Sequence, residues 1–243
     1  MSDLGRANLG AEELGAKDLG YDVAGWTPRP WPPHIPLQGQ SVRMEPIAPH
    51  HAADLFAAFS ADSQGAIWRF LPYGPFATLP EFEAWMAQTV FTKDPQFYVF
   101  IPETTGKAAG MAALMRLAPD HGVVEVGHIT MAPGLQRTVA ATQGLYLLMN
   151  LCMSDLGYRR FEWKCNALNL ASRRAAERYG FTFEGVFRQS NVFKGRNRDT
   201  AWFAFLDSEW PAIQRGFAAW LDPSNFDDQG RQVRTLAACR SDP

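Results

Sequence analysis

A turn of small residues between an apolar strand and a helix constrains the fold of this chain most strongly. Residues 125–133 read EVGHITMAP, a strand-like run, and residues 136–142 read QRTVAAT before an apolar helical stretch. About thirty residues later a second helix opens with NLASRRAAERYGF at residues 169–181. A strand, a tight turn and a helix N-terminus bring backbone N–H groups and the positive end of the helix dipole to one point. The pattern therefore predicts a pyrophosphate site beside the carboxyl end of a strand in an open sheet.

The order of these elements resembles the GNAT superfamily of N-acyltransferases, and within it the RimJ/RimL-type branch typified by protein N-terminal acetyltransferases. The superfamily loop pattern Q/R-x-x-G-x-G/A is matched at its first and last positions by Gln136 and Ala141, whereas its middle glycine is Val139. Later motifs of the branch follow in the same order, at Asn169, Ser172, Gly180, Phe181, Glu184, Gly185, Asp199, Glu209 and Trp210. Valine does not share the backbone freedom of glycine, so Val139 could instead close the loop to a phosphate.

The resemblance implies a GNAT fold of the α/β (α+β) class, with a mixed central sheet of about six or seven strands flanked by helices. Alternating apolar residues predict strands at residues 41–47, 96–103, 106–119, 122–132, 161–165, 183–189 and 199–206. Helical spacing and caps predict helices at residues 50–61, 81–91, 138–156, 169–180 and 208–221.

Three regions differ in composition. Residues 1–40 form an N-terminal extension, in which we expect a disordered tail over 1–20 and a proline-rich arm over 21–40 with Trp26 and Trp31 as anchors. Residues 41–222 are expected to be one acetyltransferase domain, and residues 223–243 a loosely ordered polar tail.

The bulk properties exclude several classes of protein. The 243 residues are 47% apolar and 20% charged with a net charge of −2, which favours a globular protein over a nucleic-acid or membrane-surface binder. No apolar run reaches the roughly 18 residues of a membrane span, and the N-terminus has no secretory signal pattern. The three cysteines show no C-x-x-C spacing and the five histidines no ligand spacing. We expect a cytoplasmic protein without a metal, as a monomer or homodimer.

The resemblance implies that acetyl-coenzyme A is the co-substrate and that its pantetheine arm lies between splayed parallel strands at residues 125–132 and 161–165. Arg173 could reach the 3′-phosphate or instead pair with Glu177 on its own helix. Strand backbone, loop N–H groups and the second helix would bind the co-substrate through Ile129, Thr130, Met131, Gln136, Arg137, Thr138, Val139, Ala140, Ala141, Thr142, Asn169, Ser172 and Arg173.

Glu125 and His128 are the candidate general bases. They are three residues apart, so a regular strand would turn them to opposite faces unless Gly127 forms a bulge. The alternatives are a solvated glutamate and a core histidine. Where many superfamily members have a tyrosine that protonates the leaving thiolate, this chain has Ala176. Ser172 is the replacement donor that the branch implies, or else simply part of a helix cap.

The acceptor side is less constrained by sequence. Trp68, Tyr73 and Phe76 belong to an aromatic segment that could line an acceptor slot or lie in the core. Residues 191–199 carry lysine and arginine that could attract an acidic acceptor or be solvated. We expect an acyl-coenzyme A-dependent N-acyltransferase acting by direct amine attack, with a protein α-amine as acceptor. A small-molecule amine acetyltransferase and a non-catalytic acyl-coenzyme A-binding module are the alternatives.

Overall fold

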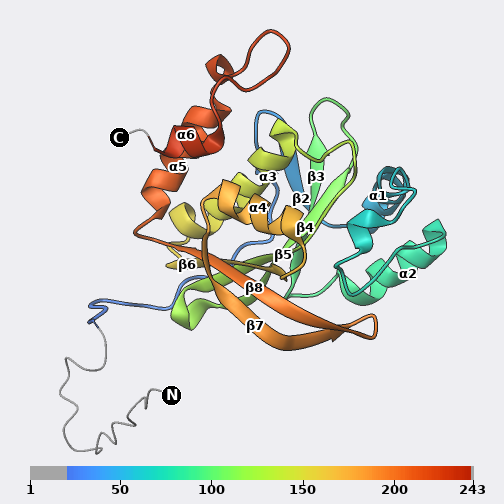
Figure 1. Ribbon diagram of the computed structural model, residues 1–243, viewed down its shortest axis with the longest axis horizontal. Coiled ribbons are helices and arrows are strands. Elements are labelled where there is room, and N and C mark those ends of the chain that lie inside the picture. Colours follow the sequence, from blue (N-terminus) through green and yellow to red (C-terminus); the bar gives the residue numbers. More distant parts are fainter. Residues whose placement is uncertain (1–20, 242–243) are drawn as a thin grey trace, which may run out of the picture.

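The computed structural model describes residues 21–241, so the tail expected for residues 1–20 lies outside the described residues. Its core is one mixed sheet with the strand order β1-β2-β3-β4-β5-β6-β8-β7 (Figure 1). All neighbouring strands are antiparallel except β5 and β6. The strands are β1 (Leu37–Gln38), β2 (Val42–Pro46), β3 (Gln96–Pro102), β4 (Gly110–Ala118), β5 (Val123–Met131), β6 (Arg160–Asn166), β7 (Thr182–Phe193) and β8 (Arg196–Leu206).

The α/β class with a mixed central sheet is confirmed, but the sheet has eight strands rather than six or seven. The additional strand is β1, two residues long, which pairs with β2 through Leu37 and Gln38. It follows a proline-rich stretch in which no period-two pattern can develop, so only its pairing partner makes it a strand.

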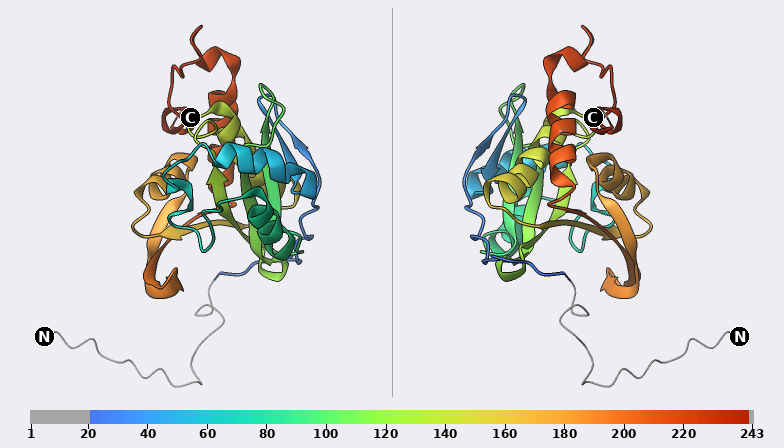
Figure 2. Two further views of the ribbon diagram at one scale, coloured as in Figure 1. Left: turned by 90° about the vertical axis from the view of Figure 1, so that its right-hand side faces the viewer. Right: turned by 90° about the vertical axis from the view of Figure 1, so that its left-hand side faces the viewer.

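Helices cover both faces of the sheet. α1 (Ala52–Phe59) and α2 (Leu79–Thr89) pack over one core, whereas α3 (Val139–Asn150), α4 (Leu170–Tyr179) and α5 (Trp210–Leu221) pack over the other. The two views of Figure 2 show α1 and α5 on opposite sides of the molecule. Side-chain caps fix several helix starts, since the hydroxyl of Thr138 accepts from Ala141 N–H and that of Thr78 accepts from Glu81 N–H. Gly180 ends α4 with a φ of 99°, the left-handed conformation that favours glycine.

β5 and β6 diverge part-way along their length. Their parallel pairing runs only from Val123 opposite Arg160 to Val126 opposite Trp163. Beyond that point β5 stays paired with β4 as far as Met131, while β6 stays paired with β8 as far as Asn166. The two central strands therefore open a gap at their carboxyl ends.

A bulge in β5 lies at His128, one residue after the glycine at which the sequence suggests it. Gly127 pairs with Ala113 and Thr130 with Met111, so β5 carries one residue more than β4 in this stretch. His128 itself has the left-handed φ of 52°. A Cβ at Gly127 would meet the sulfur of Met115, so a larger residue there would have to displace this flexible side chain.

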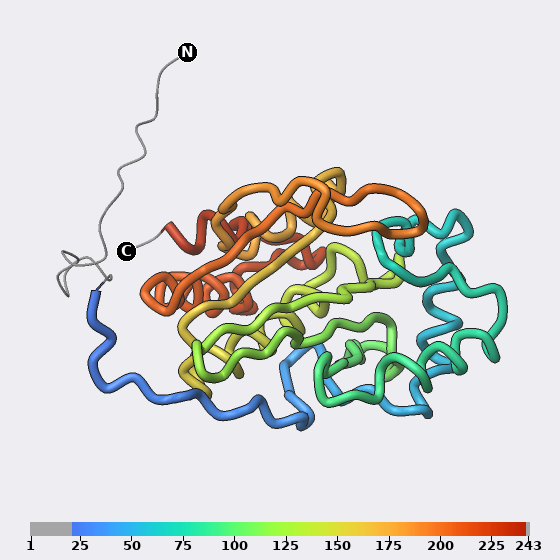
Figure 3. The backbone as a smooth tube through the Cα atoms, turned by 90° about the horizontal axis from the view of Figure 1, so that it is seen from below, coloured from blue at the N-terminus to red at the C-terminus, as the bar shows by residue number. Residues whose placement is uncertain are grey.

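Residues 21–38 lie along the outside of the domain (Figure 3). The indole Nε1 of Trp26 donates to Asp120 O at 2.9 Å, and Lys93 lies over the ring of Trp31 at 4.5 Å. Tyr98 and Tyr158 donate their hydroxyls to the carbonyls of Pro33 and Pro30. Proline carbonyls left free by an extended chain thus anchor the arm.

The C-terminal residues differ from the loosely ordered tail that their composition suggests. Residues 236–240 form a short helix, α6 (Leu236–Arg240), with Leu236 and Cys239 buried in the core beside α5. Thr235 caps this helix by accepting from Ala238 N–H. These two apolar side chains, spaced three apart, dock the helix together with the guanidinium of Arg240, which donates to the carbonyls of Arg178 and Glu177.

Candidate functional site

A cavity of about 590 Å³ opens where β5 and β6 diverge. Its walls come from residues 66–72, β5, the turn before α3, β6, the start of α4 and the β7–β8 hairpin. A volume of this size is typical of small-molecule sites. The predicted site residues that line it are Glu125, His128, Ile129, Thr130, Met131, Gln136, Arg137, Ala141, Asn169 and Ser172.

The turn before α3 places a capped helix N-terminus at one end of the cavity. Arg137 takes the left-handed conformation with a φ of 63°, and Thr138 is the N-cap. Val139 is the first helical residue and packs against the core, so no unusual φ is needed where the family pattern has glycine. The first N–H groups of a helix have no acceptor within the helix. This end therefore offers donors to an anion despite Val139.

The start of α4 places two polar side chains in the cavity lining. Asn169 is the N-cap, and its Oδ1 accepts from Ser172 N–H at 3.1 Å. This leaves the two Nδ2 hydrogens of Asn169 for other acceptors. The hydroxyl oxygen of Ser172 accepts from the indole of Trp163 at 2.9 Å, so the hydroxyl keeps its own hydrogen to donate.

Glu125 belongs to a chain of alternating charges, of which Arg116, Glu125 and Lys164 line the cavity. Its carboxylate accepts from Nη1 of Arg116 at 2.7 and 2.8 Å and from Nζ of Lys164 at 2.9 Å. Lys164 also contacts Glu162 at 2.7 Å, and Arg160 joins Glu162 to Glu184. Glu125 is 3% exposed, so it is a buried ion-paired carboxylate rather than a solvated strand end.

His128 lies on the same strand and is neutral at physiological pH. Burial lowers its pKa to about 4, with Arg116 and Arg198 adding smaller effects. Its Nδ1 lies 2.9 Å from the hydroxyl of Tyr73, and its ring packs against Phe97 at 4.9 Å. The bulge lets both His128 and Glu125 line the cavity, although they are three residues apart.

Comparison with known proteins identifies the family. Residues 41–182 match the family model described as "Acetyltransferase (GNAT) domain". The chain belongs to the GNAT acetyltransferase family. A GCN5-related N-acetyltransferase from Brucella melitensis has 48% sequence identity, covering 89% of this chain and 98% of that chain with a TM-score of 0.87. The expected N-acetyltransferase activity is confirmed at this level, and GNAT acetyltransferases use acetyl-coenzyme A as co-substrate.

Other solved structures share the GNAT fold. A protein described as a probable acetyltransferase from Chromobacterium violaceum has 39% identity over 79% of this chain and 96% of that chain, with a TM-score of 0.73. An acetyltransferase from Salmonella typhimurium that modifies the N-terminal serine of ribosomal protein L7/L12 has 18% identity over 69% of this chain and 96% of that chain, with a TM-score of 0.57, and shows the fold alone. No curated protein sequence matches the chain significantly.

Some residues predicted for the GNAT site do not line the cavity. Arg173 donates to Ala167 O at 3.3 Å and lies over the ring of Phe183, so it is turned toward β7. The aromatic residues expected at the acceptor side pack together around Trp68, which is 4% exposed. The predicted residues outside the cavity lining are Thr138, Val139, Ala140, Thr142, Arg173, Trp68, Tyr73 and Phe76.

The GNAT cavity also contains residues that sequence reasoning did not assign to the site. Arg69, Arg116, Lys164 and Tyr179 line it. Alternation in β6 puts Lys164 on the face opposite Phe161 and Trp163, but Trp163 lines the cavity as well, so alternation alone does not single out Lys164. Arg116 and Arg69 carry no local sequence signal, because β4 and the 66–72 segment reach the site only through tertiary packing.

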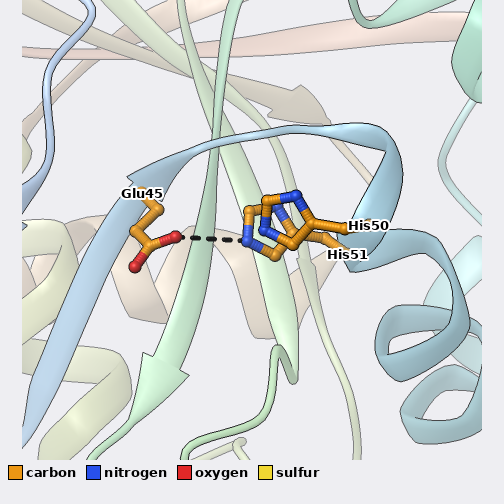
Figure 4. A group of neighbouring side chains, drawn as sticks. All are labelled: Glu45, His50 and His51. Atoms are coloured by element: carbon orange, nitrogen blue, oxygen red, sulfur yellow. Dashed lines mark hydrogen bonds and ion pairs between the residues drawn. The ribbon is translucent and has the colours of Figure 1, made fainter.

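A group of metal-ligand side chains lies apart from this cavity, at Glu45, His50 and His51 (Figure 4). Nδ1 of His51 accepts from Ala48 N–H at 3.0 Å, which requires the hydrogen of the neutral ring to be on Nε2. Nε2 faces Glu45 at 3.3 Å, and burial lowers the pKa of His51, so the ring is a neutral donor. A protonated Nε2 has no lone pair for a metal, and we assign no metal to this group.

Among the described residues, none of the helices has the length and apolar character needed to cross a membrane.

Proposed function

We propose that this GNAT acetyltransferase transfers the acetyl group of acetyl-coenzyme A to a primary amine that attacks directly. The supporting observation is the cavity between β5 and β6, which joins the N-terminus of α3 to Glu125 and His128. Cys165 lines the same cavity, but burial raises the pKa of its thiol. A protonated thiol is a poor nucleophile, which favours direct transfer over a covalent enzyme intermediate.

The co-substrate would be held by the residues at the open ends of the two strands. Acetyl-coenzyme A supplies an activated thioester carbonyl when bound. Of the N–H groups from Arg137 to Thr142, those of Arg137, Val139 and Ala140 would bind the pyrophosphate. Those of Thr138, Ala141 and Thr142 already donate to Leu135 O, Thr138 Oγ1 and Thr138 O. Backbone groups of Ile129, Thr130 and Met131, together with Nδ2 of Asn169, would hold the pantetheine arm, since all four residues line the cavity.

Three side chains are assigned to the reaction, two as alternative bases and one as a hydrogen-bond donor. His128 would accept the proton of the attacking amine at Nε2, in the tautomer whose Nδ1–H donates to the oxygen of Tyr73. Glu125 is the other candidate base, although its oxygens already accept from Arg116 and Lys164. The hydroxyl of Ser172, oriented by the indole of Trp163, would donate a hydrogen bond to the departing thiolate and keep its proton, because a serine hydroxyl is a weaker acid than a thiol.

The proposed acceptor is a protein N-terminal α-amine, in line with the RimJ/RimL-type motifs at Asn169 and Ser172. A small-molecule amine is the second candidate. It is favoured by Nζ of Lys194, which donates to Trp68 O at 2.9 Å and so connects the β7–β8 hairpin to the segment beside the cavity. Free, buried thiols at Cys152, Cys165 and Cys239 agree with a cytoplasmic enzyme, which we propose acts as a monomer or homodimer.

The test is thermal unfolding of the full chain with and without acetyl-coenzyme A, followed by thiol release with amine acceptors. Ligand at a hundred times its dissociation constant should stabilise the fold by about 2.7 kcal/mol. We expect a clear shift that Asn169→Ala weakens, and thiol release with N-terminal peptides. No shift at millimolar ligand would contradict the proposed co-substrate site. Thiol release with small amines but not with peptides would favour the second candidate.

A further inference from the structure

One cationic side chain of the cavity has no counterion in the described part of the protein. Arg198, on β8, lines the cavity, and none of the described residues accepts a hydrogen bond from its guanidinium. Its Nε is fully buried, and the group stacks on the ring of Phe193 at 4.5 Å. Burial also lowers the pKa of Arg198. An unpaired, half-buried guanidinium is unfavourable on its own and is expected to have a partner in the working protein.

The neighbouring charges do not supply that partner. Arg116, Glu125, Lys164, Glu162, Arg160 and Glu184 form a continuous chain of ion pairs in which positive and negative groups alternate. The three cations and three carboxylates of this chain have a net charge of zero. Arg198 stands outside this chain and adds an uncompensated positive charge to the cavity.

Arg198 belongs to the part of the cavity where the chemistry is proposed. Its charge acts on His128 and on Glu125, and the same two residues face the charge of Arg116. The donors proposed for the pyrophosphate lie at the start of α3, whereas Arg198 enters the cavity from β8, which β6 separates from β5. In an experiment with saturating coenzyme A, the phosphates are present throughout and cannot themselves produce a preference for a carboxylate.

Arg116 has guanidinium N–H groups that could bind the same anionic partner as Arg198. Its Nη1 contacts Glu125, whereas none of the described residues accepts from its Nη2 or Nε. The residue is held in a β4 bulge with a left-handed φ of 49°. The carboxylate of Asp94 accepts from the N–H groups of Arg116 and Leu117 at 3.0 and 3.1 Å and so fixes this conformation. Strained backbone that is secured in this way is a common feature of ligand sites.

We propose that Arg198, together with the Nη2 and Nε donors of Arg116, binds a carboxylate of the acyl acceptor. The acceptor is then an amine that carries a carboxylate a few bonds from its nucleophilic nitrogen. A guanidinium matches a carboxylate with two parallel N–H···O bonds, which would place the amine beside neutral His128. This inference rests on the proposed function. Polyamines and aminoglycosides would be disfavoured, because they bring further positive charge to an already cationic pocket.

The experiment measures binding, so it does not depend on turnover. The full chain with saturating coenzyme A is melted with N-acetylglycine and with N-acetylglycinamide, which differ only in the carboxylate. A second pair is an N-acetylated peptide amide that begins with Asp and its counterpart that begins with Asn. The first pair tests an α-carboxylate and the second a side-chain carboxylate.

We expect the carboxylate member of at least one pair to bind about 10–100-fold more tightly than its neutral partner. Arg198→Gln should abolish that preference and Arg198→Lys should retain part of it. Arg196→Gln is the matched control, because Arg196 is exposed on the same strand and does not line the cavity. All variants should fold, since Arg198→Gln removes an unpaired charge.

Equal binding of both members in both pairs would overturn the inference, as would a preference that survives in Arg198→Gln. The shift with acetyl-coenzyme A alone reports on the proposed function separately. A normal increase in melting temperature with acetyl-coenzyme A, without a preference for the carboxylate ligands, would therefore contradict only the proposed class of acceptor. The proposal that the protein is an acetyl-coenzyme A-dependent acetyltransferase would still hold.

Discussion

The hydroxyl of Tyr73 lies 2.9 Å from Nδ1 of His128, and the two rings are nearly parallel, with an interplanar angle of 12°. Burial raises the pKa of Tyr73 and lowers that of His128 to about 4, so both groups are uncharged at neutral pH. The hydrogen bond joins the aromatic segment after the first helix to the bulge in β5. It thereby fixes the orientation of the imidazole at the centre of the proposed site.

The lowered pKa of His128 predicts acid sensitivity. Between pH 6.5 and 4 the unfolded chain binds a proton at this residue that the folded chain does not, so stability falls as pH falls. The loss should be about 2–3 kcal/mol between pH 7 and 4.5. Urea unfolding across this range should show a smaller loss in His128→Gln than in the wild type. Identical pH profiles for the two proteins would show that His128 does not titrate in this way.

The ion pairs of Glu125 predict that its negative charge stabilises the folded protein, independently of any part in catalysis. Glu125→Gln leaves Arg116 and Lys164 without their shared carboxylate, and we expect about 3 kcal/mol of destabilisation in urea unfolding. Glu184→Gln, at the half-exposed end of the same chain, should lower stability by only about 0–1 kcal/mol. Equal effects of the two substitutions would contradict the burial argument.

Ser172 offers a test with an internal control. Its hydroxyl accepts from the indole of Trp163 at 2.9 Å, and Ser154, which does not line the cavity, accepts from that of Trp210 at 2.8 Å. Both Ser→Ala variants should lose about 1–2 kcal/mol of stability, because each leaves an indole N–H without its acceptor. Only Ser172→Ala should lower kcat, by about 10²-fold, with the KM for acetyl-coenzyme A little changed. If the two variants lost turnover equally, Ser172 would have no chemical role.

Val139 should not obstruct the co-substrate. Because it is the first residue of α3 with ordinary helical geometry, Val139→Gly should lower stability by about 1 kcal/mol without improving acetyl-coenzyme A affinity. Arg137→Gly should leave stability unchanged or raised, since Arg137 is the residue with a left-handed φ of 63°. Calorimetric binding and melting of both variants check this. A tenfold gain in affinity for Val139→Gly would show that valine narrows the loop.

Local patterns in the sequence determined the family and the central elements of the fold. The alternation of residues 161–165 predicted a strand, and β6 covers these residues with Phe161 and Trp163 in the same core. Gly180 predicted the end of a helix and takes the left-handed conformation there. These predictions succeed because strand alternation and helix capping depend on neighbours a few residues apart.

Only the tertiary structure decided how the site is completed. Glu125 is paired with Lys164 on the neighbouring strand and Arg116 on the other side, and Arg198 arrives from β8 without a hydrogen-bond acceptor among the residues that the structure describes. The bulge at His128 likewise depends on how β5 pairs with β4. Strand register and charge pairing arise from contacts between residues far apart in the chain, and one sequence contains no local signal for them. For the bulge, Gly127 indicated the neighbourhood, and the pairing with β4 decided the residue.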